Sequence, residues 1–142
     1  KMHSLNTIKE QNKSNAKKLI DLTIKNGGVS FNNNLEALTL KEGFAVGIKP
    51  IKEVNESFSN DKKVIEKILN TLEPFKANCI DEKGKEYNCF YGLWVSELGV
   101  FYLDGCVQIL DYQTAVNYGK HFEQIAIYDF KNEIEINLKG GN

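Results

Sequence analysis

The chain of 142 residues contains no arginine, because all 18 of its basic residues are lysine. Arginine is the side chain that makes planar, two-pronged hydrogen bonds to phosphate, carboxylate and guanine. Without it, tight and sequence-specific recognition of DNA is not expected. Histidine is nearly missing as well, since His121 is the only one beyond the first four residues.

Long apolar runs are also absent. No stretch approaches the roughly 18 apolar residues that a membrane-spanning helix needs, and residues 1–25 are polar rather than signal-like. The three cysteines, Cys79, Cys89 and Cys106, form no Cys-x-x-Cys pair, and an odd number favours reduced thiols. These absences predict a cytoplasmic protein without a membrane segment.

The sequence lacks the motifs of common catalytic and metal sites. Scattered carboxylates and one inner histidine have no metal-ligand spacing, and Asp104-Gly105 is typical of a turn rather than of a calcium loop. Gly27-Gly28 follows a helix, whereas phosphate-binding loops follow a strand. We therefore expect no cofactor, no metal ion and no catalytic residue. A small enzyme that combines Cys106, His121 and Asp129 is the weakest of the hypotheses that remain.

What the chain does contain predicts one α+β domain over residues 1–142. The expected architecture is a largely antiparallel sheet of about five to seven strands with three helices packed against it. Residues 5–26 are predicted to form the N-terminal helix, and residues 1–4 a tag or a disordered start. Further helices are expected from about Asn60 and over 112–119, and strands at 29–31, 43–49, 75–80, 87–96, 100–109, 125–130 and 134–138, with a surface loop at 50–58.

Aromatic residues concentrate in and beside the predicted strands between residues 90 and 128. Tryptophan and tyrosine are favoured anchors at protein interfaces, although the same residues also fill the cores of small α+β domains. We predict Tyr91, Trp94, Tyr102 and Tyr128 as contacts to a protein partner, with core packing as the open alternative.

A row of lysines marks the N-terminal helix. Lys9, Lys13 and Lys17 recur every four residues with Lys18 beside them, so phosphates of a nucleic acid could line this stripe. Residues 1–25 hold six lysines against two acids, and residues 90–142 hold three lysines against seven acids. The alternative is an ordinary solvent-exposed helix face.

The segment 113–130 is interpreted as a structural joint rather than a site. Ala115 and Gly119 lie four residues apart, on one face of the predicted helix, where small residues allow close packing on a sheet. Gln124 and Asp129 lie at the two ends of the next strand, where their side chains can hold loop backbone.

One spaced pattern of residues consists of Gly92-x-Trp94, Gly99, Tyr102-Leu103-Asp104, Asp111, Ala115, Gly119 and Gln124-x-Ala126-Ile127-Tyr128-Asp129, preceded by the strand segment Gly43-Phe44-Ala45-Val46-Gly47. This pattern resembles a group of small accessory proteins encoded by bacterial plasmids, integrated elements and phages. The resemblance covers residues 27–138 and implies no catalytic residues. It implies a mobile-element context, in which small proteins inhibit host defence, as anti-CRISPR-type proteins do, or assist transfer. We therefore expect a non-enzymatic inhibitor that binds a host or element protein, with a nucleic-acid-associated accessory as the alternative.

Overall fold

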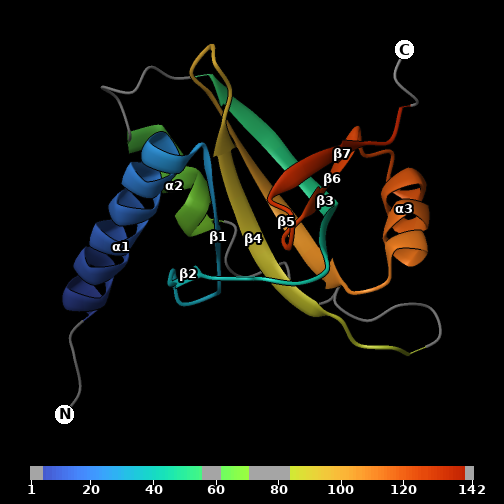
Figure 1. Cartoon of the computed structure of the whole chain (residues 1–142). Helices are drawn as coiled ribbons and strands as arrows, with labels where there is room; N and C mark the ends of the chain where they lie inside the picture. The colour runs from blue at the N-terminus through green and yellow to red at the C-terminus, as the bar shows by residue number, and fades with distance from the viewer. Residues whose placement is uncertain (1–4, 56–61, 71–83, 140–142) are drawn as a thin grey trace.

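An open, seven-stranded sheet forms the centre of the structure, which is a computed structural model that describes residues 5–55, 62–70 and 84–139. The strands are β1 (Gly28–Phe31), β2 (Ala37–Leu38), β3 (Phe44–Asn55), β4 (Asn88–Val95), β5 (Val100–Ile109), β6 (Ala126–Asp129) and β7 (Ile134–Asn137). Their order across the sheet is β2-β1-β4-β5-β3-β6-β7, and every neighbouring pair is antiparallel (Figure 1).

Three helices accompany this sheet in the described part of the chain: α1 (Leu5–Asn26), α2 (Lys62–Asn70) and α3 (Tyr112–His121). α1 and α2 lie side by side at the β1–β4 half of the sheet, and α3 lies at the β3–β6 half (Figure 1). The predicted α+β class, strand number and helix number are confirmed. No helix within the described ranges is long and apolar enough to cross a membrane.

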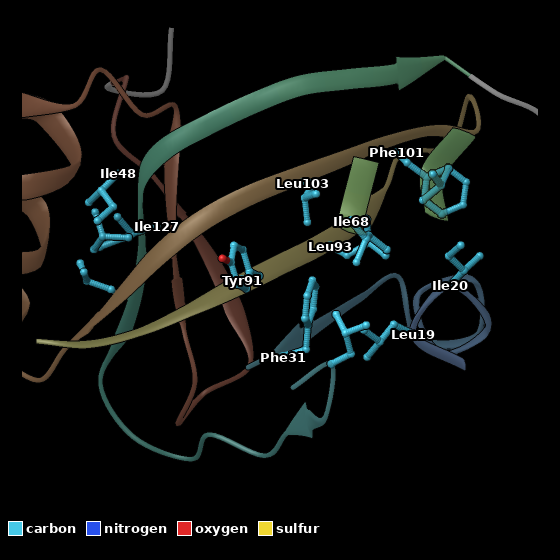
Figure 2. Close-up of a cluster of buried hydrophobic side chains, with 14 of the residues drawn as sticks. Leu19, Ile20, Phe31, Ile48, Ile68, Tyr91, Leu93, Phe101, Leu103 and Ile127 are labelled. Atoms are coloured by element: carbon cyan, nitrogen blue, oxygen red, sulfur yellow. The ribbon is translucent and has the colours of Figure 1, made fainter. Parts of the chain in front are cut away.

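All three helices contribute to one hydrophobic core on one side of the sheet. On β4, Tyr91 and Leu93 point toward the helices, while Phe90 and Trp94 point to the other side, as the period of two in a strand requires. Figure 2 shows side chains of α1 and α2 meeting those of the sheet in this core. Its largest fully buried members are Leu19, Ile20, Phe31, Ile68, Tyr91, Leu93, Phe101, Leu103 and Ile127.

The segment 113–130 connects α3 to β6 and holds the helix close to the sheet. A Cβ atom on Gly119 would lie 3.0 Å from Ile127 Cγ2 and even closer to Leu138 Cδ1, so a larger residue would force one of these side chains or α3 itself to shift. Asp111 caps α3 by accepting a hydrogen bond from the Thr114 backbone N–H at 2.8 Å. At the far end, the Asp129 carboxylate accepts hydrogen bonds from backbone N–H groups of the following turn.

β3 departs from the prediction, because it continues through Pro50 to Asn55 instead of giving way to a surface loop. β3 pairs with β5 along most of its length but with β6 only at Phe44 and Ala45. Beyond Ala45, one side of β3 therefore makes no ladder with β6, and an edge is where a strand tolerates proline. Two register shifts in the β3–β5 ladder accompany this extension.

Some predictions lie outside the described residues: the tag-like residues 1–4, the cap of α2 near Asn60 and the strand at 75–80. The short strand β2 was not predicted. Cys89 is disulfide-bonded, so the prediction that all cysteines are reduced thiols is wrong for this residue. Cys79 lies outside the described residues, and Cys106 is a free, buried thiol.

Candidate interaction surface

The side of the sheet opposite the main core carries none of the three helices, and we call it the helix-free face. The strand register places one set of side chains on it. Because Trp94 pairs with Tyr102, Phe90 with Cys106 and Asn88 with Gln108, these residues share a side of β4 and β5. Tyr128 joins them through its pairing with Ala45, which in turn pairs with Gln108. Thus three of the four predicted contact residues, Trp94, Tyr102 and Tyr128, lie on this face.

Trp94 and Tyr102 form a stacked aromatic pair at one end of the helix-free face. Their ring centroids are 4.1 Å apart and their planes differ by 11°. Trp94 is nevertheless 43% exposed. Its neighbour on the other side is Gly28 of β1, which has no side chain to cover the ring. The pair therefore presents the indole of Trp94 to solvent from a rigid strand.

Asp104 lies two residues beyond Tyr102 along β5, on the same face, and is half-buried. Burial raises the pKa of its carboxyl group, and a hydrogen bond donated by the Trp94 indole N–H offsets part of this effect. The carboxylate is thus held beside the exposed indole.

Tyr128 marks the opposite end of the helix-free face and is 40% exposed. It aligns with Gln108, six residues beyond Tyr102 along β5, which places it about 20 Å away. Its cross-strand partner is Glu135 of β7. Burial, and then the charges of Glu133 and Asp129, raise the pKa of the Tyr128 phenol.

A small second core links these two ends. Phe90, Cys106 and Phe130 are buried together, and Leu38 and Leu40 pack against them. The rings of Phe130 and Tyr128 make an edge-to-face contact with 5.5 Å between their centroids, so Phe130 packs against the Tyr128 ring. The middle of the helix-free face is therefore apolar. Each end carries an exposed aromatic side chain with a carboxylate beside it.

Tyr91 does not belong to this surface, so its assignment as a contact residue is corrected. It is only 1% exposed and stacks on Phe31 at 5.3 Å inside the main core. Burial raises the pKa of its phenol. Tyr91 and Trp94 are three positions apart in β4, and an odd offset makes them point to opposite sides of the sheet.

The four predicted nucleic-acid contacts, Lys9, Lys13, Lys17 and Lys18, are all exposed on α1. α1 covers the helical side of the sheet through Ala16, Leu19 and Ile20, which are among its buried residues. The lysines and the aromatic contacts therefore lie on opposite sides of the domain.

The residues of the hypothetical Cys/His enzyme are not assembled. Cys106 lies in the second core, and burial raises the pKa of its thiol, which disfavours the reactive thiolate. His121 is exposed at the end of α3, on the helical side. The Asp129 carboxylate is engaged by Asn132 and the backbone of its own turn, which lowers its pKa. No hydrogen bond joins these three, and the described residues contain no cluster of metal-ligand side chains.

Asp104 and Glu135 lie on the helix-free face, although neither is predicted from the sequence as a contact residue. The Asp104-Gly105 dipeptide is typical of a turn, but here it lies within β5. The alternation of side chains along β5 could have predicted this position, because Asp104 is two residues from Tyr102 and therefore points to the same side.

Comparison with known proteins adds no assignment: no family model, no curated protein and no solved structure matches this chain.

Proposed function

We propose that the chain is a non-enzymatic binding protein that docks on another protein through its helix-free face. The observation that carries this proposal is the exposed, stacked Trp94–Tyr102 pair on a rigid strand, with Tyr128 exposed at the other end of the same face. A tryptophan that remains 43% exposed beside a tyrosine is a typical interface anchor, because its apolar area is left for a partner to bury.

The biological role that we propose is that of a mobile-element accessory which inhibits a bacterial defence system, in the manner of anti-CRISPR-type proteins. Its support is the spaced sequence pattern that runs from Gly92 to Asp129. Several residues of that pattern have structural tasks, including the Asp111 cap and the Gly119 contact. Trp94, Tyr102 and Tyr128, by contrast, reach the helix-free face, where recognition can take place.

The test is a phage plating assay in bacteria with an active CRISPR–Cas or restriction–modification system. We expect the wild-type chain to restore phage plating and the triple variant W94A/Y102A/Y128A to lose this effect. The matched control is Y112A/F122A, which removes two exposed aromatic side chains from the α3 region on the helical side. Circular dichroism must show that both variants keep the fold. A folded triple variant that still inhibits contradicts the assigned surface, and a wild-type chain that protects against no defence system contradicts the role.

A second candidate function is association with nucleic acid through α1. The observation that favours it is the exposure of Lys9, Lys13, Lys17 and Lys18 on one helix. Its signature is binding that weakens steeply with added salt.

A further inference from the structure

The described side chains of the helix-free face that carry a charge are acidic. Among the strand residues whose side chains are described there is no lysine, and the charged residues are Asp104, Asp129 and Glu135. Asp129 is buried in its turn, but Asp104 and Glu135 lie on the helix-free face. Each of them accompanies an exposed aromatic residue, Trp94 in one case and Tyr128 in the other.

An aromatic ring beside a carboxylate is a favourable site for a cation. The ring face attracts a cationic group within about 6 Å of its centroid, and the carboxylate supplies the opposite charge. Arginine suits such a site better than lysine, because its planar guanidinium stacks on the ring while its N–H groups reach the carboxylate. At Trp94, one ring face is covered by Tyr102 and the other borders Gly28, so one face is accessible.

The state of Asp104 in the free protein strengthens this argument. The carboxylate is half-buried, and the loss of hydration disfavours its ionised form and raises its pKa. A cation that arrives with the partner offsets this cost. The chain itself contains no arginine, so a second copy of the chain cannot supply the guanidinium.

We infer that the partner of the helix-free face is a protein segment whose arginine side chains lie on Trp94 and pair with Asp104. The inference rests on the proposed function, since it specifies the partner's chemistry at the same surface. A nucleic acid is not the expected occupant, because its phosphates would face Asp104 and Glu135.

Trp94 is the only tryptophan in the chain, so its fluorescence reports directly on this site. The full chain is titrated at low salt with an acetylated tetra-arginine amide, with a tetra-glutamate peptide and with oligothymidylate, each to millimolar concentration. We expect a saturable change in Trp94 fluorescence with tetra-arginine only. D104N keeps the shape of the side chain and an acceptor for the indole N–H, and it should weaken the binding about tenfold. D21N makes the same charge change on the exposed side of α1 and should leave binding unchanged.

Three outcomes overturn the inference: no saturable response to tetra-arginine, an equal response to tetra-glutamate or oligothymidylate, or equal affinities of D104N and wild type. These outcomes leave the proposed docking function standing if W94A/Y102A/Y128A still abolishes inhibition of defence. Conversely, the chain could bind tetra-arginine in a way that depends on Asp104 and yet inhibit no defence system. That result would support the arginine site and contradict the proposed role in inhibiting host defence.

Discussion

At the scale of single residues, position in the strand alternation decides which aromatic side chain is core and which is surface. Tyr91 and Trp94 are three residues apart in β4, yet the first is 1% exposed and the second 43%. Composition does not distinguish them, since both residue types fill cores and interfaces. What distinguishes them is that the helices cover one side of the sheet, which assigns odd and even positions to different environments.

Asp104 gives the clearest prediction at this scale. Its folded-state pKa is raised by burial, so the unfolded chain ionises at lower pH than the folded chain does. As pH rises through the interval between the two pKa values, the free energy of unfolding falls, and it stays reduced at neutral pH. We therefore expect D104N to be more stable than wild type at pH 7 and to lose this advantage at low pH.

Urea unfolding followed by circular dichroism over a series of pH values measures this effect. D21N serves again as the control, because Asp21 is exposed on α1 and should show no such gain. A D104N protein that is less stable than wild type at pH 7 contradicts the burial argument and indicates that the carboxylate makes a stabilising contact.

At the scale of elements, the position of α3 depends on the missing side chain at residue 119. A Cβ atom there would lie 3.0 Å from Ile127 Cγ2 and closer still to Leu138 Cδ1. Alanine normally favours a helix over glycine by about 1 kcal/mol. Here we expect the contact to dominate, so that G119A lowers the free energy of unfolding by about 1–3 kcal/mol through overpacking.

A double-mutant cycle with L138A tests the cause of this loss. Because L138A removes the side chain nearest to the added methyl group, the double variant should be more stable than the sum of the two single changes predicts. Chemical denaturation of the four proteins gives the coupling energy. Additive effects, or a G119A protein at least as stable as wild type, would show that α3 does not need this close approach.

Most elements followed from local patterns, and the exceptions have identifiable causes. α1 and β5 occupy the predicted ranges because their apolar spacing and flanking glycines are clear. The local rule that a strand ends before proline predicts an end at Lys49, but β3 continues through Pro50, because an edge position tolerates proline. β2 is only two residues long and depends on its pairing with β1, which no local pattern encodes.

The candidate site was predictable only in part. Trp94, Tyr102 and Tyr128 were expected at the surface, but their common face and their separation of about 20 Å depend on the register of β4, β5, β3 and β6. The acidic partners of these aromatics were missed for the same reason. Cross-strand neighbours are far apart in sequence, so only the assembled sheet reveals them.

At the scale of the whole molecule, the lysines of α1 and the described carboxylates of the helix-free face lie on opposite sides of the sheet. The helical side presents Lys9, Lys13, Lys17 and Lys18 on α1, and the helix-free face presents Asp104 and Glu135. Such a separation orients an approaching charged partner, because each side attracts a different class of surface. A basic protein surface should meet the helix-free face, and a nucleic acid should meet α1.

The quadruple variant K9Q/K13Q/K17Q/K18Q separates the two candidate functions. We expect it to inhibit host defence as well as wild type, because the lysines lie across the sheet from Trp94.

If α1 instead binds nucleic acid, the affinity of the wild type for duplex DNA should fall steeply with salt, with a log–log slope near −0.9 for each phosphate contact. The lysine variant should lose most of that slope. Gel-shift titrations at several salt concentrations measure it, with W94A/Y102A/Y128A as the reciprocal control. One outcome would contradict docking through the helix-free face: the lysine variant loses inhibition while W94A/Y102A/Y128A keeps it. That result would assign the function to α1.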